Sequence, residues 1–275
     1  MTDSVRLESL AVLGAGKMGE TLISSLIGTG VVEPGAVTAT AVHQTRLDRL
    51  HSTFGVRTTL DNRAAVDGAE LVLLCVKPQV ASGVIAEVAD LLGPEQILCS
   101  IVAGLTTAGM ETSLEGRAVP VVRAMPNTPS RIRRGMTAVC GGLHATPEHL
   151  ALAQQLFARI GRSLVLDERY FDAVTGLSAS GPAFLYIVIE AMAEGGVKAG
   201  LPRSVATELA AQTCLGAGHM VLETGEHPAL LKDEVTTPAG CTMDGILALE
   251  QGGLRVTLIQ AILEAVRRAG GLVDG

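Results

Sequence analysis

Aromatic residues are nearly absent from this sequence: it has no tryptophan, and aromatics make up 2% of its 275 residues. Recognition of nucleic-acid bases by stacking on aromatic rings is therefore not expected. Basic residues are also few, with 21 Lys and Arg against 28 Asp and Glu and a formal net charge of -7 at pH 7. Because neutralising a phosphate backbone needs a dense basic face, this balance argues against nucleic acid as the principal partner.

The sequence also lacks the residue spacing of a metal site. Its five cysteines are odd in number and scattered, with no CxxC pair, so neither a disulfide framework nor a zinc site is indicated. Its six histidines show no ligand spacing apart from His144 and His149, which flank Pro147. We predict no bound metal.

Long hydrophobic runs are missing as well. The longest, at residues 71–76 and 183–189, are too short to cross a bilayer. Asp3, Arg6 and Glu8 interrupt the region where a signal peptide would need a continuous apolar segment. We therefore expect no membrane association and a cytoplasmic location.

The part of the chain up to residue 166 has the pattern of an α/β domain. With 48% hydrophobic residues, the chain can bury one large core or two domains of ordinary size. Short apolar runs alternate with helical patterns, and this alternation predicts crossover units and a mainly parallel sheet. The predicted strands are residues 10–13, 37–42, 71–76, 97–102, 119–123, 137–140 and 163–166.

From residue 167 onward the pattern changes to Ala- and Leu-rich stretches without strand-like alternation. The predicted helices are residues 168–177, 181–199, 202–224, 243–251 and 254–269. We therefore divide the chain into a sheet domain, 1–166, and an all-helical domain, 167–275. Several of these helices are apolar around much of their circumference and must be buried on more than one side, which favours an intertwined dimer.

The apolar run at residues 10–13 leads directly into Gly14-Ala15-Gly16-Lys17-Met18-Gly19 and then into an amphipathic stretch. This order is that of the strand, glycine turn and helix of a dinucleotide-binding unit. Gly14 permits the tight turn, Gly16 lets backbone amides approach a pyrophosphate, and Gly19 lets the helix pack close to the strand. The amides at that helix start also favour anions. We predict a bound dinucleotide, with a purely structural glycine turn as the alternative.

The second predicted strand indicates which dinucleotide is used. Strands at this position usually end in an Asp or Glu that holds the ribose hydroxyls of NAD, and here no acid lies between Glu33 and Asp48. His43, Arg46 and Arg49 are candidate partners for a 2'-phosphate, unless they only form the solvated face of a helix. We expect NADPH, with NADH as the alternative donor.

Marked loops follow the next three main strands: Lys77-Pro78, Ala103-Gly104 and Met125-Pro126-Asn127-Thr128-Pro129. Because the carboxyl ends of parallel strands meet at one edge, these loops predict a cleft there. The alternative is that the prolines mark only helix and turn boundaries.

Residues 235–245 form a loop rich in hydroxyls and small side chains that leads into a helix, with Thr242 predicted as its N-cap. The amides from Gly240 onward would be left unpaired by the helix itself and would suit a carboxylate. An ordinary capped helix is the alternative.

Taken together, these segments and the motif Asp172-Ala173-Val174-Thr175-Gly176-Leu177-Ser178-Ala179-Ser180-Gly181-Pro182-Ala183 resemble the pyrroline-5-carboxylate reductase family over essentially the whole chain. The resemblance implies an NADPH-binding Rossmann-type domain followed by an all-α dimerisation domain. It also implies intertwined dimers that often assemble into decamers, and the last step of proline biosynthesis as the reaction.

Carried over by position, the resemblance also implies site residues. The implied cofactor contacts are Leu13, Gly14, Ala15, Gly16, Lys17, Met18, Asn62, Cys75, Val76, Lys77, Pro78 and Ala103. The implied substrate contacts are Thr237, Gly240, Cys241 and Thr242, with Thr242 as the catalytic residue.

The chain departs from the family pattern in two places. Its loop reads Pro238-Ala239-Gly240-Cys241-Thr242 where the family has Pro-Gly-Gly-Thr-Thr, so a methyl group and a thiol are introduced. Ala41-Val42 stands where a Ser/Asn-Arg pair is often found, which leaves the strength of the NADPH preference open.

The implied substrate, 1-pyrroline-5-carboxylate, presents a cyclic imine and a carboxylate. A protonated iminium is already an electrophile, so positioning of the hydride supplies most of the effect and no strong acid is needed. Our hypothesis is that the amides of residues 240–242 hold the carboxylate and that the Thr242 hydroxyl contacts the ring nitrogen.

Three alternative functions remain. The chain could be another NADP-dependent cyclic-imine reductase or a non-catalytic NADP-binding scaffold. It could also be a β-hydroxyacid dehydrogenase, which relies on a helix lysine, although Lys198 fits a helix end better than that role.

Overall fold

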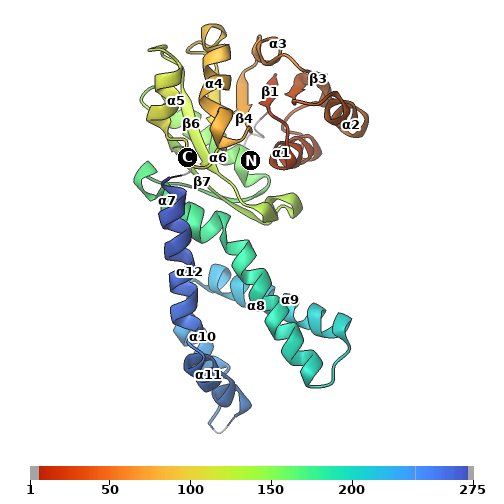
Figure 1. Ribbon diagram of the computed structural model, residues 1–275, viewed down its shortest axis with the longest axis vertical. Helices are drawn as coiled ribbons and strands as arrows, with labels where there is room; N and C mark the ends of the chain where they lie inside the picture. Colours follow the sequence, from red (N-terminus) through yellow and green to blue (C-terminus); the bar gives the residue numbers. More distant parts are fainter. Residues whose placement is uncertain (1–5, 239, 272–275) are drawn as a thin grey trace. The chain divides into compact units, whose positions relative to one another are not determined.

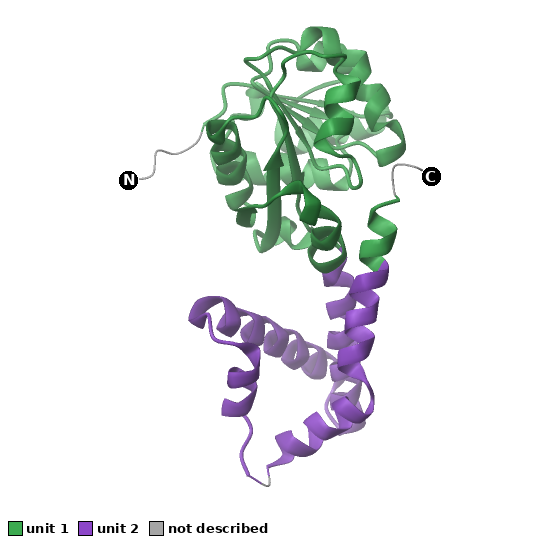
Figure 2. Cartoon of the chain, turned by 90° about the vertical axis from the view of Figure 1, so that its left-hand side faces the viewer, with its two compact units in different colours: residues 1–179, 265–275 green, residues 180–264 purple. Residues whose placement is uncertain are grey.

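A computed structural model describes residues 6–238 and 240–271 and divides the chain into two compact units (Figure 2). The first unit runs to Ala179 and includes the chain again from Ala265, and the second unit spans Ser180–Glu264. This division differs from the boundary between residues 166 and 167 that the sequence predicts. Ala239, one of the two loop departures, lies outside the described residues.

The first unit is built on an eight-stranded sheet in the order β3-β2-β1-β4-β5-β6-β7-β8 (Figure 1). Its neighbouring strands are parallel except for the antiparallel pair β6 and β7, which confirms the mainly parallel sheet. The strands are β1 (Leu10–Leu13), β2 (Val37–Thr40), β3 (Arg57–Thr59), β4 (Leu71–Leu74), β5 (Ile97–Ser100), β6 (Val121–Met125), β7 (Gly135–Gly141) and β8 (Gly161–Val165).

The sheet has its topological switch point at β1. This strand pairs with β2 on one side and β4 on the other, so the chain crosses from one half of the sheet to the other there. In doubly wound sheets a ligand lies across the carboxyl ends of the strands at that point. The fold therefore places the glycine turn, which follows β1, at the ligand-binding edge.

Helices cover both faces of this sheet. Leu10 and Val12 of β1 belong to a core cluster with residues of α1 and α6, such as Ile23. Ala11 and Leu13 point the other way, into a cluster with residues of α3, α4 and α5. The α-helices of this unit are α1 (Lys17–Gly28), α2 (Gln44–Phe54), α3 (Asn62–Val66), α4 (Pro78–Val88), α5 (Thr107–Ser113), α6 (Pro147–Ala158) and α7 (Phe171–Val174).

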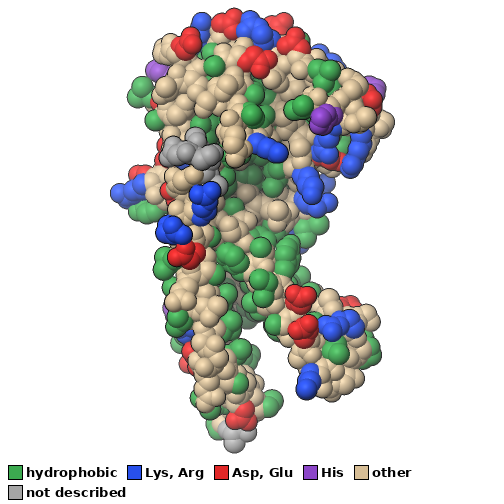
Figure 3. Space-filling view, in the orientation of Figure 1, with side chains coloured by type: hydrophobic (Ala, Val, Ile, Leu, Met, Phe, Trp, Pro, Cys, Tyr) green, Lys and Arg blue, Asp and Glu red, His purple; other side chains and the backbone are tan. Residues whose placement is uncertain are grey.

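The second unit is helical, as the sequence predicts. It contains α8 (Gly181–Lys198), α9 (Arg203–Thr224), α10 (Pro228–Glu234), α11 (Cys241–Gln251) and most of α12 (Leu254–Ala269). Among its described residues, the buried cluster consists of Ala193, Ala206 and Ala210, with Ile189 and Val197 packed against it. Many large apolar side chains are exposed instead, including Tyr186 and Leu263 at 61% and 60%, and hydrophobic side chains are seen along these helices in Figure 3. Large exposed apolar surfaces of this kind mark sites of interaction with another molecule.

One helical stretch among the described residues, Glu168–Lys198, is long and apolar enough to cross a bilayer by length and composition. A bent pair, Cys241–Gln251 with Leu254–Ala269, passes the same test jointly. The apolar run at residues 183–189 is too short to cross a bilayer by itself, but in the structure it lies inside this longer helical stretch, whereas the run at residues 71–76 forms β4 and the loop after it. One or two such helices are weak evidence for a membrane span, because the core helices of soluble proteins, which are mostly buried, pass the same test; in the first stretch 11% of the most apolar part is buried.

Candidate functional site

The glycine turn after β1 has the geometry that a dinucleotide needs. Gly14 has φ +74°, and a Cβ there would collide with Val76 Cγ1 and lie 3.1 Å from Val76 Cα. A Cβ on Gly16 would meet only Gly14 O, at 3.9 Å, so the space beside it is open to a ligand. A Cβ on Gly19 would lie 3.4 Å from Val12 Cγ1, which brings α1 close to the sheet.

The turn is fixed to the end of β2. Gly14 N donates to Thr40 Oγ1 at 3.1 Å, and Ala15 N donates to Thr40 O at 2.7 Å. Thr40 Oγ1 in turn donates to Asn62 Oδ1 at 2.8 Å, and Asn62 Nδ2 donates to Glu87 Oε2 at 3.0 Å. The Thr40 hydroxyl thus connects the glycine turn to Asn62, which the family resemblance implies as a cofactor contact.

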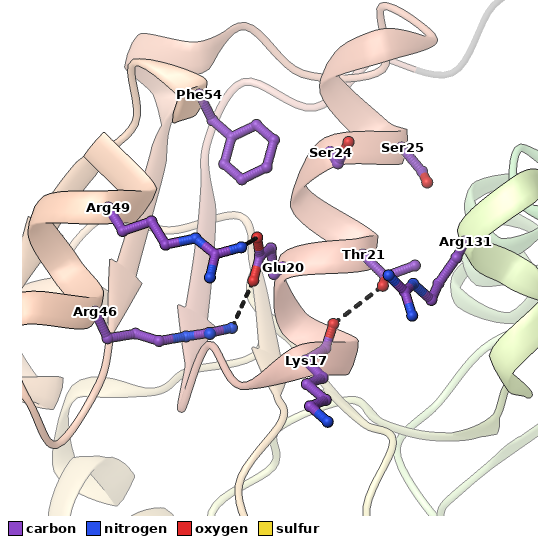
Figure 4. A pocket seen from close by; sticks show the side chains of 9 residues that line it. All are labelled: Lys17, Glu20, Thr21, Ser24, Ser25, Arg46, Arg49, Phe54 and Arg131. Carbon is purple, nitrogen blue, oxygen red and sulfur yellow. Dashed lines mark hydrogen bonds and ion pairs between the residues drawn. The ribbon is translucent and has the colours of Figure 1, made fainter. Parts of the chain in front are cut away.

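A cavity of about 470 Å³ lies over α1 (Figure 4). Arg46 Nη2 and Arg49 Nη2 both donate to the Glu20 carboxylate, at 2.8 and 2.9 Å, and Arg46 Nε donates to Ala15 O at 2.8 Å. The cavity is lined by Lys17, Glu20, Thr21, Ser24, Ser25, Arg46, Arg49, Phe54 and Arg131. The lining has four basic side chains and one acidic side chain, so the cavity is electropositive.

The three residues predicted to meet a 2'-phosphate are thus in different situations. Arg46 is held beside the glycine turn, whereas Arg49 reaches Glu20 from a mostly exposed position. His43 is the exposed N-cap residue of α2, which has no side-chain capping bond. Of these side chains, only Arg46 contacts the backbone of the glycine turn.

The loops after β4 and β5 lie at the same edge. Cys75 follows β4, and burial raises the pKa of its thiol to about 12, so the group is neutral at pH 7. Lys77 is the N-cap residue of α4, and Pro78 takes its first position, where a missing N–H costs nothing. Ala103 follows β5. The fold therefore brings the predicted cofactor residues of the first unit to one edge of the sheet.

The loop after β6 makes contacts that no pattern in the sequence predicts. Asn127 Oδ1 accepts a hydrogen bond from Met136 N at 2.9 Å, and Asn127 Nδ2 donates to Ser178 O at 3.1 Å. Ser178 lies in η5 (Thr175–Ala179), which is a single π-helical turn. These bonds join two of the motifs that carry the family resemblance.

A buried charge supports the start of the same segment. The Arg123 side chain on β6 is 3% exposed, and its Nη1 donates to Glu168 Oε1 at 2.9 Å. Its guanidinium also lies 4.7 Å from the ring centroid of Phe171, and Thr107 N donates to Glu168 at 2.8 Å. These contacts explain why residues 167–179 belong to the first compact unit. The sequence does contain one sign of this contact: Arg123 lies in a predicted apolar strand, and a charged side chain that is buried there needs a partner.

The predicted substrate loop lies in the second unit. Gly240, with φ -81° and ψ 152°, is the N-cap of α11, so the prediction that Thr242 caps this helix is wrong. Gly240 N donates to Thr237 O at 3.0 Å, and this turn sets where the helix begins. No side chain caps α11, so the amides of Cys241 and Thr242 in its first turn are available to a ligand. Cys241 and Thr237 are exposed, and Thr242 is half-buried.

Among residues 6–238 and 240–271, no group of three or more His, Cys, Asp or Glu side chains is arranged to hold a metal ion.

A doubly wound sheet with an open glycine turn at its switch point is the architecture of a dinucleotide-binding domain. In agreement, a family model described as "NADP oxidoreductase coenzyme F420-dependent" matches residues 9–104. A second, described as "Pyrroline-5-carboxylate reductase dimerisation", matches residues 168–272 and thus the helices with exposed apolar faces.

Comparison with known proteins gives the family. The chain is 41% identical over 263 residues to the pyrroline-5-carboxylate reductase of Methanosarcina acetivorans, covering 95% of this chain and 97% of that one. It is also 41% identical over 259 residues to that of Arabidopsis thaliana, with 94% and 92% covered. The structure of a pyrroline-5-carboxylate reductase from Coxiella burnetii matches with a TM-score of 0.88 and 34% identity, covering 97% and 99%. The chain belongs to the pyrroline-5-carboxylate reductase family.

Proposed function

We propose that this protein reduces 1-pyrroline-5-carboxylate to L-proline with a hydride from NADPH, the last step of proline biosynthesis. Family membership over 95% of the chain carries the proposal. The local chemistry supports it, because one chain contains both an open glycine turn for a dinucleotide and an uncapped helix start for a carboxylate. We further propose a cytoplasmic enzyme.

The residues of the first unit fit the dinucleotide. The N-cap of α1 is Gly16, without a side-chain capping bond, so the amides after it are available to a pyrophosphate. Arg46 and Arg49 supply positive charge near the end of β2, where a 2'-phosphate would lie. We therefore propose NADPH as the preferred donor and NADH as a weaker alternative.

The residues of the second unit fit the substrate. The amides of Cys241 and Thr242 at the start of α11 would bind the carboxylate, because a helix start carries partial positive charge. The Thr242 hydroxyl would contact the ring nitrogen and orient the imine carbon. The bound dinucleotide supplies the hydride, and the chain supplies positioning rather than a strong acid.

The exposed apolar faces of the helices favour a homo-oligomer. We propose an intertwined homodimer, in which the partner's helices cover these faces, and a decamer as a further stage of assembly.

The reaction is tested by following NADPH oxidation by the purified protein with 1-pyrroline-5-carboxylate, beside NADH and beside the six-membered imine at matched concentrations. We expect L-proline to form in equal amount to the NADPH consumed, with NADH and the larger ring used more slowly. Dinucleotide binding without proline formation would contradict the proposal and favour a different imine or a non-catalytic scaffold.

Replacing Thr242 with alanine is expected to lower kcat/KM about tenfold or more, the effect of losing one hydrogen bond worth about 1.4 kcal/mol in the transition state. Steady-state kinetics at saturating NADPH measures this. Thr242→Ser keeps the hydroxyl and should retain most activity. Thr207→Ala serves as a control, because that hydroxyl donates to Arg203 O within its own helix, α9. Wild-type kinetics in Thr242→Ala would remove this residue from the mechanism.

A further inference from the structure

Asn127 joins two segments that are distant in sequence at the ligand-binding edge of the sheet. Its amide oxygen accepts from Met136 N on β7, and its amide nitrogen donates to Ser178 O in the π-helical turn. Ser178 Oγ lies 3.4 Å from the same amide nitrogen. One side chain therefore uses both its donor and its acceptor to hold the π-turn against the sheet.

The position of Asn127 relates it to the reacting end of the dinucleotide. β6 runs parallel to β5, so its carboxyl end, which Asn127 follows, lies at the same edge as the glycine turn. In a doubly wound sheet each half binds one mononucleotide, and the strand after the glycine turn meets the adenosine ribose. The half formed by β4, β5 and β6 is therefore expected to bind the nicotinamide end of the dinucleotide.

Hydrogen bonds hold both the π-turn and the segment that leads into it. Before it, Glu168 is bonded to Arg123 and Thr107. Within it, Asn127 Nδ2 donates a hydrogen bond to Ser178 O, and Ala179 packs against the cluster that contains Met125 and Ala138 of the sheet. Single π-helical turns are rare and occur frequently at functional sites. Their irregular backbone persists only where surrounding contacts hold it in place.

We propose that Asn127 is a positioning residue for the reduction: its amide fixes the π-turn Thr175–Ala179 as a wall of the nicotinamide half of the site. The proposal rests on the reductase activity proposed above. When this wall is displaced, the nicotinamide ring is misaligned against the imine carbon, and hydride transfer slows. Binding of the adenosine half, at β1 and β2, is unaffected.

The test uses two variants. Asn127→Asp keeps the acceptor for Met136 N but loses the donor to Ser178 O. In Asn127→Ser the side chain is too short to reach both groups. Gln96→Ala is the matched control. The Gln96 side chain also bridges backbone groups, accepting from Gly93 N at 3.1 Å and donating to Ala69 O at 2.9 Å. It precedes β5 and therefore lies at the opposite edge of the sheet.

Three quantities are measured on the full-length protein: kcat, the primary deuterium isotope effect on kcat with NADPH labelled at the transferred hydrogen, and the Kd of 2',5'-ADP. In both Asn127 variants we expect kcat to fall about tenfold and the isotope effect to rise, while the Kd of 2',5'-ADP stays within about twofold. Gln96→Ala should change neither kcat nor the isotope effect.

A purely structural role would lower the melting temperature and leave the isotope effect and kcat unchanged below it. Wild-type kcat in both Asn127 variants, or a parallel loss of 2',5'-ADP binding, would overturn the proposal alone. Absence of imine reduction by the unmodified protein would overturn the proposed function and this inference with it.

Discussion

Alanine in place of Gly14 is expected to weaken NADPH binding at least a hundredfold and to destabilise the first unit. The residue has φ +74°, where a Cβ costs roughly 1–2 kcal/mol. The added methyl would also collide with Val76 Cγ1 and lie 3.1 and 3.2 Å from Val76 Cα and N, and such overpacking costs about 1–3 kcal/mol. Either the glycine turn or the loop after β4 must move, and both lie at the cofactor edge. A hundredfold weaker affinity is about 2.7 kcal/mol.

Variants of two other glycines distinguish the cost of a positive φ from the loss of space for the cofactor. Gly30 has φ +71° with nothing within 4 Å of a Cβ, so Gly30→Ala should destabilise by roughly 1 kcal/mol and leave NADPH affinity unchanged. Gly16 has open space beside it and an ordinary φ of -73°, so Gly16→Ala should keep stability but weaken binding. Calorimetric titration with NADPH and urea unfolding measure both quantities. Unchanged affinity in Gly14→Ala would show that this turn does not hold the cofactor.

Much of the first unit could be predicted because its signals are local. The predicted strand at residues 10–13 coincides with β1, and the glycine turn follows it as expected. β3 was missed, because its residues Arg57, Thr58 and Thr59 include no apolar side chain that would mark a strand. Its existence depends on pairing with β2, a contact that the local sequence does not record.

The site could be predicted only in part, for a related reason. Residues of the glycine turn and of the loops after β4 and β5 follow from the rule that strand ends share one edge. The bond from Asn127 to Ser178 joins residues 51 positions apart, and no periodicity in one sequence indicates such a pair. The N-cap of α11 was misplaced for another reason: glycine and threonine are both accepted at N-caps, and the turn from Thr237 to Gly240 decides between them.

Removing the Glu168 carboxylate is expected to lower the free energy of unfolding by about 3–5 kcal/mol, the usual effect of leaving a buried charge without its partner. In Glu168→Ala the Arg123 guanidinium, whose side chain is 3% exposed, loses its ion pair, and Thr107 N loses its acceptor. Thermal or urea unfolding of the purified variant measures the loss. The same change frees the start of the segment that leads into the π-turn, so kcat should fall as well, even at temperatures where the variant remains folded.

An exposed ion pair in the same unit provides the matched control. Arg6 and Glu33 lie 3.2 Å apart with both side chains 68% exposed, so Glu33→Ala should cost no more than about 1 kcal/mol. A double variant, Arg123→Leu with Glu168→Leu, should recover part of the stability, because it removes the buried Arg123 charge together with its partly buried partner. If Glu168→Ala destabilises no more than Glu33→Ala, the Arg123 charge is not buried in solution, and the Glu168 contacts do not hold the segment that leads into the π-turn. If Glu168→Ala is strongly destabilised but keeps the wild-type kcat while folded, and Asn127→Asp keeps its stability but loses kcat, the two contacts have separate roles: the ion pair stabilises the fold, and the Asn127 amide positions the reacting groups.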